Sequence, residues 1–273
     1  MIAIDLIVTT AQHATSSIIK QAEATADKLS VPFIPRKGLS LAAIKQEYQI
    51  SELLVITGNG PVIHTAAGEY FFHLSMAELR IKNLKSGNHD HMTTAMGLTA
   101  GMSVLDCTLG LATDAIVASF VIGEHGLITG LESSPLIAFI TGYGLQNFVV
   151  ASDPALISAL RRIKVHNADY SEHLKACANN SFDVVYFDPM FRAPIQKSSN
   201  VKPIRSLANK QPITVEAIRQ ACRVARKRVV VKETTGSGEF VRLGIKTVVG
   251  GKYSSIHYGV IDCGPWQTGG DQP

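Results

Sequence analysis

Val184-Val185-Tyr186-Phe187-Asp188-Pro189-Met190-Phe191 is the stretch that decides the fold expected of this chain. Its apolar first half indicates a buried strand, which ends where Asp188 meets Pro189. The residue before a proline favours extended backbone, and proline itself has no N–H to donate. The backbone carbonyls near Asp188 and Pro189 are therefore free to accept hydrogen bonds from an exocyclic amine, while Phe191 can stack on its ring. The motif predicts methyl transfer onto nitrogen, provided that the chain also holds a methyl-donor site.

Outward from this strand, apolar runs alternate with helical segments from about residue 92 onward. This order predicts an α/β fold with a mostly parallel sheet, helices on both faces and an antiparallel edge. In such sheets, ligands bind outside the carboxyl ends of the strands, where the strand order reverses. The expected strands are residues 103–105, 127–131, 162–166, 183–187, 228–231, 246–249 and 257–261.

The first of these strands leads into a turn of mostly small residues, Asp106-Cys107-Thr108-Leu109-Gly110-Leu111-Ala112-Thr113-Asp114. Small residues between a strand and a helix let the backbone approach a ligand closely. The turn lacks the G-x-G-x-x-G spacing that is typical of dinucleotide-binding proteins. Its first residue, Asp106, suits a cationic amino-acid ligand better than a pyrophosphate.

Carboxylates follow three further strands in order. Glu132 ends the second strand, where it can accept both hydroxyls of a ribose, a feature that fits NAD as well as S-adenosylmethionine (SAM). Asp169 follows the third strand and could meet an adenine amino group, and Asp188 follows the fourth. Acids at four successive strand ends, the last of them in Asp-Pro-x-Phe, predict a SAM site.

These motifs resemble class I SAM-dependent methyltransferases and, more narrowly, the RsmJ-type small-subunit rRNA guanine-N2 methyltransferases. The resemblance covers about residues 78–262. It implies a Rossmann-like methyltransferase domain, SAM as the methyl donor, and a guanine amine of ribosomal RNA as the acceptor. The best-matching pieces are Asp106–Leu111, Thr113–Ala115, Leu131–Pro135, Tyr186–Phe191 and Arg228–Lys232.

The motifs and the resemblance together assign expected roles to individual residues. Three positions depart from the family pattern, which tends to carry glycine at Ala112, arginine at Thr113 and proline at Arg192. The expected catalytic residues are Asp188, Pro189 and Phe191. The expected cofactor-binding residues are Asp106, Thr108, Gly110, Thr113, Asp114, Glu132, Ser133, Asp169 and Asp188.

Positive charge gathers in two stretches that contain no acid, Arg192–Lys210 and Arg223–Lys232, with five basic residues in each. The net charge of +4 alone does not indicate a partner. Clustered charge of this kind is either a phosphate footprint or a solvated loop and helix end. With RNA as the expected partner, the expected contacts are Arg80, Lys82, Arg192, Lys197 and Lys232.

The chain is expected to divide into two domains. Residues 1–75 are interpreted as a small N-terminal α/β domain with a helix over 16–29. Residues 76–91 are polar and basic, and we expect them to connect it to a methyltransferase domain over 92–263. The Gly-rich segment 264–273 is expected to be a flexible tail.

Composition favours a globular protein of the cytoplasm. Apolar residues make up 46% of the chain and charged residues 18%. The four cysteines form no C-x-x-C pair, which argues against a thiolate zinc site and suits a reducing compartment, so no metal is expected. The N-terminus shows no leader pattern, and no run of about 18 apolar residues predicts a membrane span.

Three other functions stay open at the level of sequence. Asp-Pro-x-aromatic also serves adenine and glutamine amides, so a methyltransferase acting on DNA, protein or a small molecule is the first alternative. A noncatalytic RNA-binding protein that retains a donor site is the second, although the intact Asp188–Phe191 motif argues against it. A nicotinamide oxidoreductase is the third, and the missing glycines disfavour it. Binding of SAM rather than NAD would separate a methyltransferase from the third alternative.

Overall fold

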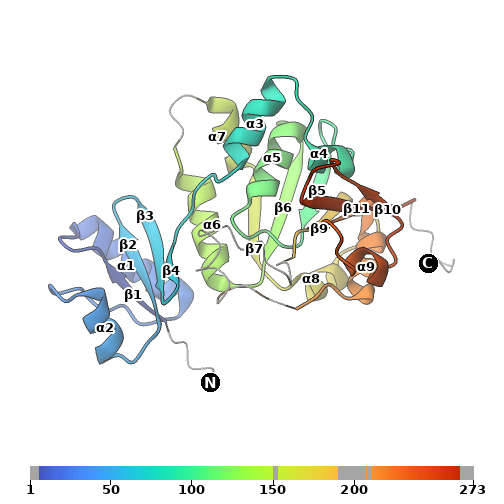
Figure 1. Cartoon of the computed structure of the whole chain (residues 1–273). Helices are drawn as coiled ribbons and strands as arrows, with labels where there is room; N and C mark the ends of the chain where they lie inside the picture. Colours follow the sequence, from blue (N-terminus) through green and yellow to red (C-terminus); the bar gives the residue numbers. More distant parts are fainter. Residues whose placement is uncertain (1–5, 150–152, 190–206, 208, 210, 265–273) are drawn as a thin grey trace.

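The computed structural model describes residues 6–149, 153–189, 207, 209 and 211–264, which form two sheets (Figure 1). A four-stranded sheet lies in the N-terminal part and a seven-stranded sheet in the remainder. Three residues that the sequence places in the site, Phe191, Arg192 and Lys197, fall outside the described residues, as does the segment 265–273.

The larger sheet confirms the predicted parallel arrangement with an antiparallel edge. Its strand order is β10-β11-β9-β8-β5-β6-β7, so the chain leaves the central β5 toward β7 and then returns to build β8 and β9 on the other side. Strands β5 to β9 pair in parallel, whereas β11 pairs antiparallel with both β9 and β10. The strands are β5 (Ser103–Asp106), β6 (Leu127–Glu132), β7 (Ile163–Asn167), β8 (Phe182–Phe187), β9 (Ala225–Thr234), β10 (Thr247–Val249) and β11 (Ile256–Asp262).

Helices cover both faces of this sheet, as the sequence predicts. Successive side chains of β8 point to opposite faces, so Val184 and Tyr186 pack in one apolar cluster, and Val185 and Phe187 in another. The first cluster includes residues of α3, α4, α5 and α7, and the second includes residues of α8, α9 and α10. These helices and α6 are α3 (Ala77–Lys85), α4 (His91–Met96), α5 (Thr113–Ile122), α6 (Pro135–Asn147), α7 (Pro154–Arg161), α8 (Tyr170–Ala176), α9 (Val215–Val224) and α10 (Glu239–Arg242).

The N-terminal part is a small α/β unit with strand order β1-β2-β3-β4. Strands β1 and β2 are parallel, and the remaining pairs are antiparallel. Helix α1 spans the predicted range and begins after Thr15, whose side chain accepts a hydrogen bond from the Ile18 amide. The elements are β1 (Leu6–Thr10), α1 (Ser16–Leu29), α2 (Leu41–Glu47), β2 (Glu52–Thr57), β3 (Gly60–Thr65) and β4 (Gly68–Tyr70).

The N-terminal unit packs directly against helix α6 of the larger domain (Figure 1). Leu136, Ile137 and Ile140 of α6 share one apolar cluster with residues of β1, β2, β3 and α1. Leu111, in the turn after β5, contacts the same cluster. The two parts therefore share a core, and the N-terminal unit supports the turn that is expected to bind the donor.

The segment expected to be a polar connector, residues 76–91, contains a helix. Helix α3 buries Ala77 and Ile81, four residues apart on one face, and packs against α5. Asp90 then caps α4 by accepting a hydrogen bond from the Thr93 amide. Within the described part of the chain, we find no helix that is both long and apolar enough to cross a membrane.

Candidate active site

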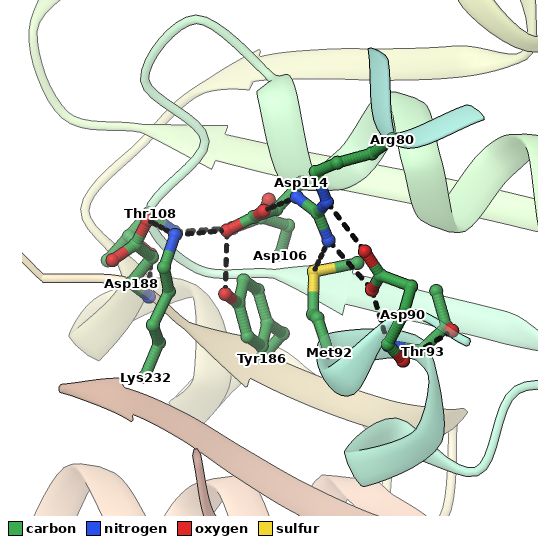
Figure 2. Close-up of polar contacts among 10 residues, drawn as sticks. All are labelled: Arg80, Asp90, Met92, Thr93, Asp106, Thr108, Asp114, Tyr186, Asp188 and Lys232. Carbon is green, nitrogen blue, oxygen red and sulfur yellow. Dashed lines mark hydrogen bonds and ion pairs between the residues drawn. The ribbon is translucent and has the colours of Figure 1, made fainter. Parts of the chain in front are cut away.

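The carboxyl ends of the parallel strands bring the predicted acids to one edge of the sheet. Asp106 ends β5 and Glu132 ends β6, while Asp188 directly follows β8. The register aligns Asp106 with Tyr186 of β8, and Phe187 with Val231 of β9. Lys232, the next residue of β9, therefore lies level with Asp188. Figure 2 shows Asp106, Asp188 and Lys232 within one group of polar side chains.

Asp106 is almost completely buried at the start of the turn after β5, with 3% of its surface exposed. One carboxylate oxygen accepts a hydrogen bond from the Thr108 amide at 3.0 Å. Its other oxygen has no hydrogen-bond partner among the described residues. Burial raises the pKa of Asp106 to about 8. A carboxyl group in this state is suited to a cationic ligand that would restore its charge.

Glu132 connects this turn to the end of β6. Its carboxylate accepts hydrogen bonds from the amides of Gly110 at 3.1 Å and Ser134 at 2.8 Å. Burial raises the pKa of Glu132 as well. Gly110 and Ala112 both have left-handed backbone, with φ of 52° and 61°. The backbone at position 112 thus has a conformation that favours glycine. The family tends to carry glycine there, whereas this chain carries Ala112.

Asp114, at the start of α5, is the centre of a buried ionic network (Figure 2). One carboxylate oxygen accepts from Arg80 at 2.5 Å, and the other accepts from Lys232 at 2.8 Å and from the Tyr186 hydroxyl at 2.7 Å. Burial alone would raise the pKa of Asp114, but Lys232 and Arg80 hold it well below its usual value. The same carboxylate favours the charged form of Lys232, whose pKa is raised.

Lys232 links this network to Asp188. Its ammonium nitrogen lies 2.8 Å from the Asp188 carboxylate, as it does from Asp114. Burial raises the pKa of Asp188 to about 6, although the Lys232 ammonium acts in the opposite direction. The Asp188 amide donates to the Thr108 hydroxyl at 2.5 Å. Asp188 is therefore fixed from two sides, and 30% of its side chain is exposed.

Comparisons with known proteins identify the family of the chain. A family model described as "Putative SAM-dependent methyltransferase" matches residues 69–249, more than half of the chain. The chain belongs to this methyltransferase family.

Two relatives of this methyltransferase align with most of its length. "Uncharacterized protein YpiP" of Bacillus subtilis is 36% identical over 259 residues, covering 94% of this chain and 100% of that protein. Ribosomal RNA small subunit methyltransferase J of Thioalkalivibrio sulfidiphilus is 28% identical over 233 residues, or 81% of this chain and 85% of that protein. The crystal structure of a SAM-dependent methyltransferase from Neisseria gonorrhoeae covers 97% of both chains at a TM-score of 0.64 and 19% identity, and so has the same fold.

The remaining predicted cofactor residues of the methyltransferase lie at the same edge. Asp169, between β7 and α8, accepts a hydrogen bond from the Ser171 amide at 2.8 Å. Ser133 follows Glu132, and its carbonyl accepts from Asn167 at 3.1 Å. Thr113 is the first residue of α5 and is partly exposed. Asp114 differs from these three residues. Among the described residues, both of its carboxylate oxygens already accept hydrogen bonds from side chains of the protein.

Two of the residues expected to contact RNA, Arg80 and Lys232, form ion pairs within the protein. The guanidinium of Arg80 makes two hydrogen bonds to Asp90, at 2.7 and 2.9 Å, in addition to its contact with Asp114. Lys232 is similarly engaged, with only 18% of its side chain exposed. Neither cation is presented to an external phosphate, so we assign both to the internal network. Lys82, in contrast, is exposed on α3.

Sequence reasoning did not single out Tyr186, Asp90 or Thr141 as parts of the site. Tyr186 lies within the quoted strand, but only the fold shows that its hydroxyl meets Asp114. Asp90 precedes α4 at a capping position, which was a local signal available in the sequence. The hydroxyl of Thr141, on α6, donates a hydrogen bond to the Gly110 carbonyl at 2.6 Å. The two residues are 31 positions apart in the sequence.

Proposed function

We propose that this methyltransferase transfers a methyl group from SAM to the N2 amine of a guanine in small-subunit ribosomal RNA. The observation that carries the proposal is Asp188-Pro189 at the end of β8, with the Asp188 carboxylate held by Lys232 beside Asp106. The name of one relative adds support. The ribosomal RNA small subunit methyltransferase J described above aligns with 81% of this chain.

The residues at the strand ends fit the three chemical parts of SAM. Asp106 offers a buried carboxylate oxygen without a described partner to the ammonium of the methionine part. Glu132, which the amides of Gly110 and Ser134 and the neighbouring Ser133 hold in place, would accept the ribose hydroxyls. Asp169 would accept from the adenine amino group with its second oxygen. Thr108, Gly110, Thr113 and Ser133 would line this site with small side chains.

When bound, SAM supplies a methyl group on a positively charged sulfonium. The guanine amine is a poor nucleophile, because its lone pair is delocalised into the ring. The Asp188 carboxylate and the nearby backbone carbonyl would accept hydrogen bonds from the amine and stabilise the positive charge that develops on nitrogen. Transfer would form an N–C bond as the S–C bond breaks and leaves its electron pair on sulfur, and Asp188, with its pKa of about 6, could accept the proton that nitrogen loses.

Positioning accounts for most of the expected rate gain in this mechanism. Alignment of an attacking atom with its target can contribute roughly 7–11 kcal/mol. Thr108 ties Asp188 to the donor turn, and Lys232 orients its carboxylate. Pro189 offers no N–H that would compete with the substrate amine. Phe191 would stack on the base.

The RNA would be held outside this pocket. A paired guanine must first leave its stack, at a cost of a few kcal/mol. Lys82, Arg192 and Lys197 are the proposed phosphate contacts, so affinity for RNA should fall steeply with salt. Because its proposed substrate is ribosomal RNA, we expect the enzyme to work in the cytoplasm.

Label transfer from methyl-labelled SAM tests the proposal. Naked rRNA, small subunits, DNA, cell protein and small molecules from a strain that lacks the gene would each be offered as acceptors. Label in the RNA or subunit fraction with the wild-type enzyme, and none with Asp188→Asn, is the expected result. Label confined to DNA, protein or small molecules would refute ribosomal RNA as the substrate.

A further inference from the structure

The turn between β10 and β11 carries an unusually exposed aromatic side chain. Tyr253 is 91% exposed, which is more than any other large apolar residue in the described part of the chain. A tyrosine ring is large and mostly apolar, so its exposure leaves a flat apolar face available for stacking. Neither the family match nor the donor site accounts for this residue.

The turn lies at the same edge of the sheet as the active site. Strand β11 runs antiparallel to β9, and Tyr258 pairs with Lys232 while Ile256 pairs with Thr234. The chain that precedes Ile256 therefore continues past the carboxyl end of β9, beyond Lys232. With a rise of about 3.3 Å per strand residue, Ile256 at the start of β11 lies roughly 7 Å past the level of Lys232, and the turn precedes it. The turn therefore lies beyond the strand ends that carry Asp188 and Lys232.

Hydrogen bonds hold the turn to the end of β9. The Thr235 amide donates to the Ser255 carbonyl at 3.0 Å, and the Thr235 hydroxyl donates to the Ser254 carbonyl at 2.7 Å. Within the turn, the Ser254 amide donates to the Gly251 carbonyl at 2.9 Å. Tyr253 is thus presented from an anchored turn, so a ligand that covers it needs to order little of the backbone.

A cation lies beside the ring. The ammonium of Lys252 lies 5.5 Å from the centre of the Tyr253 ring, and no acidic residue occurs from Lys246 to Tyr258. His91 lies next to Gly251. The neighbouring acids are engaged elsewhere, because Asp90 pairs with Arg80 and the Glu233 carboxylate accepts from the Thr234 amide.

We propose that Tyr253 and Lys252 form a binding site for an unpaired nucleotide of the RNA substrate, flanking the methylated base. The base would stack on the Tyr253 ring, and Lys252 would contact the adjacent phosphate. An exposed aromatic ring beside a cation is the combination that binds single-stranded nucleic acid without reading its sequence. The inference rests on the proposed function, since it supplies the enzyme with a second contact to the same RNA.

Binding of naked small-subunit rRNA and of a single-stranded RNA oligonucleotide tests this site. Stacking of one base contributes about 1–3 kcal/mol, so Tyr253→Ala should weaken binding roughly 5- to 150-fold. Tyr253→Phe should restore most of the affinity, because it keeps the ring. Affinity for RNA falls as salt rises, and Lys252→Gln should make this fall less steep, by about 0.7–0.9 in the slope of log affinity against log salt. Val241→Ala, at another exposed apolar position, serves as the control.

Two further readouts separate this inference from the proposed function. Affinity for SAM should be the same in Tyr253→Ala as in the wild type, whereas the KM for RNA should rise. If the wild type methylates RNA and Tyr253→Ala binds RNA equally well, the stacking site is refuted and the proposed function stands. If the wild type neither binds nor methylates RNA, both are refuted. Selective loss of binding by Tyr253→Ala, without label transfer to RNA, would support the site and refute the proposed substrate.

Discussion

Asp188 is the residue on which the proposed chemistry depends. It directly follows β8, the strand that the sequence marks most clearly, and Lys232 holds its carboxylate while 30% of the side chain is exposed. Its proposed function requires the charged form, because a neutral carboxyl group can neither take up the proton that nitrogen loses nor offset the positive charge that develops there. The pKa of about 6 places the loss of this form close to neutral pH.

The rate of methyl transfer should therefore fall as the pH decreases through about 6. Above that value Asp188 is ionised and active, and below it the carboxyl group is protonated. Because the Lys232 ammonium lowers the pKa of Asp188, Lys232→Gln should move this decline to higher pH. Profiles of kcat/KM against pH would check both statements. A Lys232→Gln profile that declines at lower pH than the wild type would contradict them.

Asp106 provides a prediction for donor binding. With a pKa of about 8 in the free protein, it is mostly protonated at pH 7. A cationic methionine group beside it would favour the carboxylate, so SAM binding at pH 7 should release a proton. Calorimetry in two buffers with different ionisation enthalpies would detect this proton. Equal binding enthalpies in both buffers would exclude the proposed contact, and Asp106→Asn, which cannot titrate, is the control.

At the scale of single elements, strands and long periodic helices were predictable from sequence. The expected strands match β5 to β11 to within a few residues, because most of them contain an apolar run, such as Val184–Phe187 in β8 and Val229–Val231 in β9. Helix α3 was missed because only Ala77 and Ile81 are fully buried, among lysines and other polar residues. A short helix with so few buried positions resembles a solvated connector in sequence.

The site was predictable where its residues follow strands, and much less so where they pair across the chain. Asp106, Glu132 and Asp188 could be placed at one edge because parallel strands share their direction. The partners of Asp114, in contrast, are 34 and 118 residues away, at Arg80 and Lys232. No local pattern encodes such pairs, so both cations were expected to bind RNA.

Helix α3 should be held in place by Arg80. Replacing it by Met removes one of the cations that neutralise Asp114, and breaking a buried ion pair costs about 3–5 kcal/mol. We expect the lower end of this range, because Lys232 remains. Lys82→Met, on the exposed side of the same helix, should change the unfolding free energy by no more than about 0.5 kcal/mol. Equal urea unfolding curves for the two variants would contradict this account of the network.

At the scale of the whole molecule, the N-terminal unit and the methyltransferase domain form one body through α6. Phe72 lies against Gly144 of that helix, and Tyr143 lies against Gly60 of β3. Leu111 joins the shared cluster from the donor turn. Loss of this contact should therefore affect both stability and donor binding.

Two glycines of α6 allow a matched test of this interface. A Cβ at Gly144 would lie 1.9 Å from the Phe72 ring, so Gly144→Ala should destabilise the protein by about 1–3 kcal/mol. A Cβ at Gly142 would meet nothing closer than 3.8 Å, so Gly142→Ala should be neutral or stabilising by up to about 1 kcal/mol. Urea unfolding and limited proteolysis between the two parts would measure the effect. Unchanged stability and proteolysis in Gly144→Ala would argue against a tight interface.

The most direct test of the central claim is nucleoside analysis of small-subunit rRNA from cells. RNA would be compared from a strain that lacks the gene and from the same strain complemented with the wild-type or the Asp188→Asn protein. We predict that one N2-methylguanosine is lost in the deletion strain and restored by the wild type alone. An unchanged N2-methylguanosine content in the deletion strain, or full restoration by Asp188→Asn, would contradict the account.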